Sequence, residues 1–482
     1  MGAMMKLSKR GAGKERESRL FILAVVLLFL ILNLLLTYLA TSYGWYFLAI
    51  DPMYYTLSGA TDDFFDEVNP EGKRVEFYFC MSEASLTENH TFGRILDTVK
   101  QFDERYDFFS VKHLDTYYDF ATLDRFAKEH ETELTNQSVI LYSPDTGRSE
   151  VRSLSTFYYY DTADSSNDDM TYNGEEIVAS LTGAVLGVDR STVLFTMGHG
   201  EAPTVSLLNA FYSAGYDIAT KDISEGAIPE EVSMIVIAAP KYDFEEYADK
   251  TIECEISRLR AFVDAGGTVI YLRSASVGVL PRLDAFYGGY GITPAEGMIT
   301  DPSHAVDPSG KAVLLRYDEG EGARSIREYA LSYNSARLAA AGTAPLALSG
   351  NAVGLLSTHN TAYHAIAGER VSDAPDGGYT VAALAPASGG QGSVALISAE
   401  AFAEVDTMET DGYGNKEFLF SLLREITGAS APIGCGVLQI NTYPLEDMTR
   451  GTANVYLAIF GVAIPLAVAL TGVVVLRRRY HR

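Results

Sequence analysis

The sequence predicts an α/β protein built from two consecutive domains and flanked by two transmembrane helices. Short apolar runs of strand length alternate with amphipathic patterns of helix length through the middle of the chain, which is typical of sheets covered by helices. The chain has 482 residues, a length that favours more than one hydrophobic core. Near each end lies an uncharged apolar run that reaches the roughly 20 residues needed to cross a bilayer as a helix.

The first domain is predicted over residues 70–160. Strand and helix patterns follow one another in the order β-α-β-α-β-β, which is that of a thioredoxin-like domain. The predicted elements are Val75–Cys80 (strand), Thr91–Arg105 (helix), Phe108–Lys112 (strand), Ala121–His130 (helix), and the hairpin strands Ser138–Ser143 and Ser149–Tyr158. Cys80 ends the first strand, where such folds keep redox cysteines, but no partner cysteine follows it. We therefore expect this domain to serve as a scaffold.

The second domain is predicted over residues 172–430 as a flavodoxin-like, doubly wound parallel sheet. Helix patterns alternate here with very apolar strand patterns, as expected for a sheet covered on both faces. The predicted elements are Glu175–Leu186 (helix), Ser191–Thr196 (strand), Thr204–Ala214 (helix), Tyr216–Asp222 (strand), Val232–Ala239 (strand), Ile252–Ala265 (helix) and Thr268–Arg273 (strand).

The later part of this domain is predicted less regularly. Residues from about 300 to 400 follow few clear patterns and are interpreted as an irregular insertion. The elements expected to return to the sheet are the strands Thr380–Leu384 and Ser393–Ser398 and the helix Asn415–Ile426.

The apolar runs at 20–42 and 455–476 are predicted to span a membrane. The tails at 1–19 and 477–482 are rich in Lys and Arg, as cytoplasmic flanks of membrane helices are. We therefore expect a two-pass protein of the cell (plasma) membrane, with both termini cytoplasmic and a large extracytoplasmic domain. In the alternative interpretation the first run is a cleaved signal peptide, but its length and the lack of a small-x-small cleavage site favour an anchor.

Composition excludes several classes of function. The formal net charge is −26, which disfavours nucleic acid as a partner because such binding needs Lys and Arg opposite the phosphates. The three cysteines, Cys80, Cys254 and Cys435, lie far apart in sequence. They match neither a disulfide framework nor the spacing of zinc ligands. No metal site and no cofactor are predicted.

The turn Met197-Gly198-His199-Gly200-Glu201 is the candidate ligand-binding site. It follows an apolar strand and precedes a helix, the position at which open α/β sheets bind ligands. Gly198 and Gly200 allow tight backbone geometry, His199 is a candidate general base or metal ligand, and Glu201 suits a helix start. The alternative is a purely structural turn in which His199 makes a hydrogen bond and Glu201 caps the helix.

No catalytic residue is predicted. The sequence contains no GxSxG elbow, no GxxxxGK[ST] phosphate loop and no GxGxxG fingerprint, so it lacks the common signatures of serine hydrolases, P-loop ATPases and dinucleotide-binding enzymes. Cys254 is predicted to lie in a helix rather than at a strand-to-helix turn. A non-enzymatic protein is therefore favoured.

Three short motifs carry a resemblance to a known family. They are the strand-GHGE turn at 198–201, Tyr287-Gly288-Gly289-Tyr290-Gly291-Ile292, and Gly412-Tyr413-Gly414-Asn415 before a helix. With the overall layout, these motifs resemble the gliding-motility-type ABC-transporter auxiliary component family. The resemblance covers nearly the whole chain and implies extracytoplasmic α/β domains between two membrane helices. It establishes no catalytic residue.

The resemblance implies a membrane-anchored, non-catalytic auxiliary subunit of an ABC-2-type transporter. Its expected partners are an ABC-2-type permease, a separate ABC ATPase and the membrane, and its outer domains would bind the permease, the cargo or an envelope component. Two alternatives remain open: a membrane-bound hydrolase or amidotransferase-like enzyme that uses His199 and Glu201, and a glycan-binding module that uses its aromatic surface.

Overall fold

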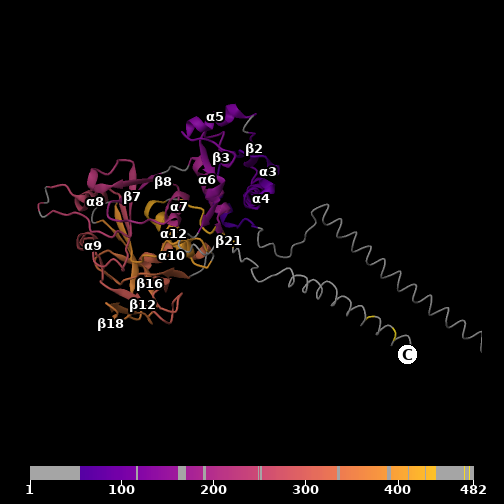
Figure 1. The fold of residues 1–482 in the computed structure, drawn as a ribbon. Helices are drawn as coiled ribbons and strands as arrows, with labels where there is room; N and C mark the ends of the chain where they lie inside the picture. The colour runs from indigo at the N-terminus through magenta and orange to yellow at the C-terminus, as the bar shows by residue number, and fades with distance from the viewer. Residues whose placement is uncertain are drawn as a thin grey trace, which may run out of the picture. The chain divides into compact units, whose positions relative to one another are not determined.

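The structure is a computed structural model. It describes residues 55–440 with gaps at 116–117, 161–169, 188–190, 248, 250–251, 334–336, 388–391, 411 and 429, together with Gly472 and Arg477. The predicted α/β class is confirmed: helices alternate with strands through the described chain (Figure 1). The sheets are mixed, however, because the predicted parallel sheet of the second domain is continued by antiparallel strands.

The first sheet, which we call the N-terminal sheet, has the strand order β2-β1-β3-β4. Strand β1 pairs with β2 in parallel and with β3 antiparallel. Over residues 70–160 the predicted elements are observed in the predicted order, with two differences. The elements are α2 (Ala60–Val68), β1 (Val75–Phe79), α3 (Glu83–Glu88), α4 (His90–Arg105), β2 (Phe109–His113), α5 (Phe120–Glu129), β3 (Ser138–Tyr142), β4 (Ser149–Ser153) and η1 (Leu154–Phe157). An additional short helix, α3, precedes α4, and the predicted strand Ser149–Tyr158 ends at Ser153, after which the 3-10 helix η1 begins.

Helix α4 shows why this part of the chain folds as it does. Its apolar residues recur every three or four positions, so they form one stripe that is buried against the N-terminal sheet. Asn89 begins the helix, and its side-chain oxygen accepts hydrogen bonds from the backbone N–H groups of Thr91 and Phe92 at 2.9 and 3.2 Å. These bonds satisfy two donors that a helix start otherwise leaves unpaired.

The second sheet, which we call the main sheet, has the strand order β14-β13-β16-β19-β20-β10-β9-β7-β8. Strands β8, β7, β9, β10 and β20 are mutually parallel, whereas β19, β16, β13 and β14 follow in antiparallel pairs. The strands are β7 (Ser191–Met197), β8 (Tyr216–Asp222), β9 (Val232–Ala238), β10 (Thr268–Leu272), β13 (Val313–Tyr317), β14 (Leu338–Ala340), β16 (Val353–Thr358), β19 (Thr380–Pro386) and β20 (Ser393–Ile397).

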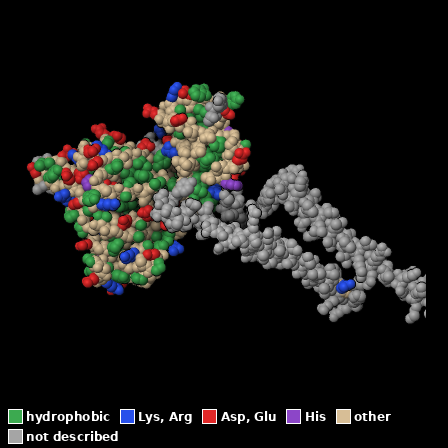
Figure 2. Space-filling model, viewed as in Figure 1, with side chains coloured by type: hydrophobic (Ala, Val, Ile, Leu, Met, Phe, Trp, Pro, Cys, Tyr) green, Lys and Arg blue, Asp and Glu red, His purple; other side chains and the backbone are tan. Residues whose placement is uncertain are grey.

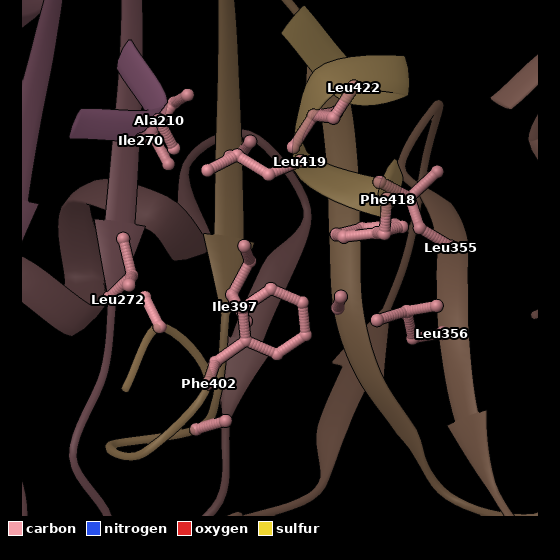
Figure 3. Packing of buried hydrophobic residues seen from close by; sticks show 14 of the residues in the cluster. Ala210, Ile270, Leu272, Leu355, Leu356, Ile397, Phe402, Phe418, Leu419 and Leu422 are labelled. Carbon is pink, nitrogen blue, oxygen red and sulfur yellow. The ribbon is translucent and has the colours of Figure 1, made fainter. Parts of the chain in front are cut away.

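Helices cover both faces of the main sheet, which explains why its central strands are apolar throughout. Alternate residues of β10 enter different cores: Ile270 and Leu272 pack on one face, and Val269 and Tyr271 on the other. Figure 3 shows Ile270 and Leu272 in the first of these cores, near residues of α12 and β20. The covering helices are α7 (Val205–Ser213), α10 (Arg324–Tyr333) and α12 (Asn415–Thr427) on the first face, and α8 (Glu255–Asp264) and α9 (Pro281–Gly288) on the second.

The order in which strands are added to the main sheet reverses at β7, although β7, β8 and β9 are all parallel. After β7 the chain runs to β8 at the sheet edge, and then returns to β9 on the other side of β7. Such a reversal leaves a crevice at the carboxyl ends of the two strands, where ligands of open α/β sheets bind. The Met197–Glu201 turn therefore lies at the topological switch point.

The region from about 300 to 400 is more regular than predicted. Strands β19 and β20 and helix α12 lie where they were expected and join the main sheet. The prediction of an irregular insertion missed β13, β14 and β16, because they are short or rich in Ala and Gly and are therefore weak in periodicity. The remaining elements are β5 (Tyr158–Tyr160), β6 (Met170–Tyr172), α6 (Gly174–Leu186), η2 (Ile223–Glu225), β11 (Ile292–Pro294), β12 (Met298–Thr300), η3 (Glu321–Ala323), β15 (Leu346–Leu348), β17 (Tyr363–Ile366), β18 (Glu369–Asp373), α11 (Val405–Met408) and β21 (Leu438–Ile440).

At one edge of the main sheet, a side chain makes hydrogen bonds to the backbone of the edge strand β14. The Asn415 amide oxygen accepts from the Ala339 N–H at 3.1 Å, and the amide nitrogen donates to the Ala339 carbonyl at 2.8 Å. The same nitrogen also donates to the Phe402 carbonyl at 2.7 Å. Because Ala339 lies in the edge strand β14, Asn415 pairs with the edge as a neighbouring strand would.

The predicted localisation needs correction. Among the residues that the structure describes, no helix combines the length and the apolar character required to cross a membrane. The runs at 20–42 and 455–476 lie outside the described residues except for Gly472. The expectation of a two-pass plasma-membrane protein with an extracytoplasmic domain is therefore not supported, and we do not carry it further.

Candidate functional site

The Met197–Glu201 turn is formed by the end of β7 and the loop that leads into α7. Gly198 and Gly200 have φ values of +109° and +75°, which L-residues with a side chain rarely adopt. A Cβ atom on Gly198 would lie 2.5 Å from a carboxylate oxygen of Asp222. The two glycines thus give the turn its shape, as the sequence predicted.

His199 is held on three sides. Its ring stacks on Phe244 with a centroid distance of 4.0 Å and an interplanar angle of 11°. Its Nε2 lies 3.1 Å from Oε2 of Glu255, and its Nδ1 lies 3.4 Å from Oε1 of Glu201. The His199 backbone N–H donates to Oε2 of Glu201 at 2.7 Å. The structure therefore brings together the two predicted polar residues and adds Glu255, from the first turn of α8.

The charge of this cluster follows from its burial and its carboxylates. Burial by itself lowers the pKa of His199, but hydrogen bonds and charge attraction from Glu201 and Glu255 outweigh it and raise the pKa to about 10. For Glu201 the two effects have opposite signs: burial raises its pKa, but hydrogen bonds, with that to His199 first among them, together outweigh burial and keep that pKa below the ordinary value. At neutral pH the cluster is an imidazolium between two carboxylates.

The crevice at the switch point is bridged by main-chain hydrogen bonds. The His199 carbonyl accepts from the N–H groups of Lys241 and Tyr242 at 2.7 and 3.0 Å, and the Ala202 N–H donates to the Ala238 carbonyl at 3.1 Å. These bonds join the loops after β7 and β9. The position that most open α/β sheets use for a ligand is thus occupied by the chain itself.

This arrangement does not suit His199 as a general base. An imidazole with a pKa near 10 keeps its proton at neutral pH, whereas a general base works best with a pKa near the working pH. Within the described residues, the His199 ring makes its polar contacts with the carboxylates of Glu201 and Glu255 and not with a hydroxyl or thiol that it could activate. Its imidazolium instead ties α8 to the turn.

Exposed apolar side chains surround the turn. We call six of them the apolar rim; Met197 ends β7, and the others lie in the loops or first helical turn that follow β7, β9 and β10. They are Met197, Val205, Tyr242, Tyr247, Ile252 and Val279, with exposed fractions of 51, 64, 68, 42, 49 and 47%. Figure 2 shows hydrophobic side chains exposed among acidic ones on this part of the surface. Clustered exposed apolar residues commonly mark sites of protein association.

The cysteines are buried and free within the described chain. Cys254 was predicted inside a helix, but it lies just before α8 as its N-cap, and its backbone N–H donates to Ser257 Oγ at 2.8 Å. Burial raises the pKa of the Cys80 thiol to about 11, which keeps it protonated at neutral pH. Within the described ranges no group of three or more His, Cys, Asp or Glu side chains has a metal-binding arrangement.

A second buried polar cluster was not predicted from the sequence. Lys416 Nζ on α12 lies 2.7 Å from Oε2 of Glu176 on α6 and 2.6 Å from Oε2 of Glu409. Glu176 also accepts from the Ser213 hydroxyl at 2.6 Å and from the Asn173 amide at 3.1 Å. This cluster links α6 to α12 through Lys416 and to α7 through Ser213. Its members lie too far apart in sequence for any local pattern to indicate the contact.

The structure also contains a cavity of about 710 Å³ beside the edge strand β14. Alanines form much of its wall, together with residues of the loop between β12 and β13 and of the segment around α11. Its lining includes Val306, Ala312, Ala339, Ala340, Tyr413 and Leu438. The low periodicity of this region hid the cavity from sequence analysis.

Comparison with known proteins gave no family and no curated relative: no family model and no curated protein matches the chain. The N-terminal domain of mmIFT52 aligns with 17% identity, covering 49% of this chain and 97% of that one, with a TM-score of 0.37. PurLQS from Thermotoga maritima aligns with 10% identity over 50% of this chain and 100% of that one, with a TM-score of 0.30. A glutamine amidotransferase from Thermotoga maritima aligns with 11% identity over 49% and 98%, with a TM-score of 0.27.

These similarities are too low to carry a functional argument. The expectation of a membrane protein active in transport and related to gliding motility is corrected, because no helix among the described residues could span a membrane and no family model or curated protein matches the chain. The resemblance to the auxiliary component family, and the permease and ATPase that it implies as partners, are not tested by these findings and stay predictions.

Proposed function

We propose that the described chain is a non-catalytic α/β binding module that holds a protein partner on the apolar rim beside the Met197–Glu201 turn. In this proposal the N-terminal sheet is a thioredoxin-like scaffold and the main sheet is a flavodoxin-like one. The observation that carries the proposal is the exposure of the six apolar rim side chains, next to a turn whose His199 ring makes its polar contacts, within the described residues, with the carboxylates of Glu201 and Glu255.

The carboxylate contacts of His199 weaken the enzyme alternative. A hydrolase or amidotransferase that used His199 and Glu201 would need a neutral histidine next to a nucleophile. In the described structure the ring faces carboxylates, which raise its pKa to about 10 and keep it protonated at neutral pH. The crevice in which a substrate would lie is bridged by the bonds from Lys241 and Tyr242 to the His199 carbonyl.

The rim supports a protein as the partner rather than a glycan. Phe157, Tyr158 and Tyr159, which belong to the aromatic run that suggested glycan stacking, are at most 6% exposed. The exposed aromatics of the rim, Tyr242 and Tyr247, are accompanied by the aliphatic side chains of Met197 and Ile252. Mixed aromatic and aliphatic surfaces with Met are typical of protein interfaces.

Site-specific photo-crosslinking in the native cell tests the proposal. A benzoylphenylalanine at position 242 should give one defined protein adduct. The same group at Val371, which is 58% exposed on β18, is the matched control and should not give that adduct. The double substitution Met197→Glu and Ile252→Glu should abolish the adduct while the thermal melting curve stays unchanged.

Either of two results would reject the binding module. One is the same adduct pattern at positions 242 and 371. The other is an adduct that survives both charge substitutions on the rim. Mass spectrometry of the adduct would also show whether its partner is the permease or the ATPase that the family resemblance implies.

A further inference from the structure

Two histidines from different loops stack face to face at the far end of the main sheet. The rings of His304 and His359 have a centroid distance of 3.8 Å and an interplanar angle of 9°. His304 lies in the loop 301–312 between β12 and β13, and His359 follows β16. Neither residue belongs to the clusters described above.

A relay of hydrogen bonds fixes the ring of His304. The hydroxyl of Thr361 donates to the carboxylate of Asp301, with both oxygens at 2.8 Å. Because that hydroxyl proton is directed to Asp301, His304 Nδ1, at 2.8 Å from the Thr361 oxygen, must be the donor in its own bond. The neutral His304 therefore carries its proton on Nδ1, and Nε2 is the position that accepts a second proton.

The charged groups near His304 differ from those that act on His359. Asp301 is completely buried, and its Oδ2 lies 3.5 Å from His304 Nδ1 and thus on the His304 side of the stack. Burial, and then the charges of His304 and of Arg316 on β13, lower the pKa of His359, while Asp301 partly offsets them. Asp301, His304 and Arg316 are the charged or titratable groups that act on His359 among the described residues.

The stack holds one wall of the large cavity. Val306 and Ala312, which belong to the loop 301–312, line the cavity of about 710 Å³ beside β14. Within the described chain, the recorded contacts between this loop and the 359–362 turn are the ring stack and the bonds of Thr361 to Asp301 and His304. The loop is also joined to β13 by the bridge between Ala305 and Val313 and by the bond from the Leu314 N–H to the His304 carbonyl at 2.9 Å. The stack is therefore the contact that sets how closely this wall lies against the 359–362 turn.

We propose that the His304–His359 stack is a pH-sensitive latch that holds the cavity-lining loop 301–312 closed at neutral pH and releases it in mild acid. When both rings are protonated, two like charges face each other at stacking distance beside the Arg316 guanidinium. The open loop separates the rings and lets water surround them. The open form thus binds the second proton more readily than the closed form, and acid shifts the population toward it.

Hydrogen exchange of the full-length protein tests the latch. The probes are the amides of His304 and Val306, which donate to the carbonyls of Asp301 and Ala312 at 3.3 and 2.8 Å. After correction for the intrinsic exchange rate, their protection should fall between pH 7.5 and pH 5.0. The upper limit is about thirtyfold, because a histidine with an ordinary pKa of about 6.5 in the open form is mostly protonated at pH 5.

Two substitutions at His359 separate the latch from a plain packing contact. His359→Phe keeps an aromatic ring in the stack and cannot titrate, and His359→Gln removes both the ring and the charge. Protection in either folded variant should be the same at the two pH values, and it should be higher in His359→Phe. His364→Gln is the matched control on β17 and should keep the wild-type pH dependence.

Three outcomes would overturn the latch. The first is wild-type protection of loop 301–312 that does not change between pH 7.5 and 5.0. The second is a wild-type loss of protection in acid that persists in His359→Phe or His359→Gln. A fall in protection that is equally large in β1 and β9 would also overturn it, since the latch acts on one loop and not on the whole fold.

Discussion

The ammonium group of Lys416 lies 2.7 Å from a carboxylate oxygen of Glu176, across 240 positions of sequence. Both side chains are buried, and Glu409 makes a second ion pair with the same ammonium at 2.6 Å. Through these contacts α6 and α12 share one buried charge cluster. Two carboxylates and one ammonium leave an excess negative charge in a place of low polarity, which makes the cluster sensitive to substitution and to pH.

Replacing Lys416 should strongly destabilise the protein. Lys416→Met leaves Glu176 and Glu409 buried without their cation, and breaking a buried pair in this way costs about 3–5 kcal/mol. Lys128→Met is the matched control, because Lys128 pairs with Asp124 on the exposed side of α5 and such pairs contribute about 0.5 kcal/mol. Urea unfolding followed by circular dichroism measures both, and equal effects would contradict the buried charge cluster.

Glu409 should make stability depend on pH near neutrality. Burial, helped by the charge of Glu176 and opposed by Lys416, raises the pKa of Glu409 to about 7. The folded protein therefore holds this proton more tightly than the unfolded chain does, so its stabilising effect is present below about pH 4.5 and is lost as the pH rises through 7.

Glu409→Gln tests this dependence, because it removes the titration and keeps the shape of the side chain. The difference in free energy of unfolding between Glu409→Gln and wild type should shift in favour of the variant from pH 5 to pH 8. Glu319→Gln, on the surface, is the control for general charge effects. A difference that is constant with pH would show that Glu409 does not titrate in this range.

His199 should make the stability of the protein depend on pH in the alkaline range. Its pKa is raised to about 10, above the ordinary value of about 6.5. Its ion pairs therefore contribute fully below about pH 6.5 and lose their contribution as the pH rises toward 10. The stability difference between wild type and His199→Gln should shrink between pH 6.5 and pH 9.5, measured by thermal unfolding with His90→Gln as the exposed control.

A side chain at position 198 should lower the free energy of unfolding. The φ of +109° at Gly198 is unfavourable for alanine, and a Cβ would displace the Asp222 carboxylate, which accepts from the Ser224 N–H at 2.8 Å. Gly278 has φ of +88° with no atom within 4 Å of an added Cβ, so Gly278→Ala reports the backbone effect alone. We expect Gly198→Ala to cost about 2 kcal/mol and Gly278→Ala about 1 kcal/mol by urea unfolding. Equal costs would show that Asp222 yields freely.

Sequence reasoning succeeded where a local pattern determines the structure. The stripe of α4 and the apolar run of β9 were placed to within a residue or two, because periodicity and burial act over neighbouring positions. The turn at Gly198 and Gly200 was found for the same reason. What the sequence left open was the environment of His199. Both a ligand site and a structural turn were compatible with the sequence, and the contact with Glu255, 56 positions away, could not be seen in it.

The missed features have a common physical cause. Each depends on contacts that form when distant segments meet. Lys416, Glu176 and Glu409 were single charges in a polar sequence, and His304 and His359 were isolated histidines. The short strands β13 and β14 owe their formation to pairing partners more than to their own propensity.

Asn415 has a consequence for how the molecule behaves at high concentration. An unfinished sheet edge is a template onto which another chain can add a strand, and repeated addition leads to fibres. At β14 the amide of Asn415 already occupies the hydrogen-bonding groups of Ala339 that an incoming strand would need. One uncharged side chain thus protects the edge strand against pairing with another chain, and its loss would expose an edge on which fibres could begin to form.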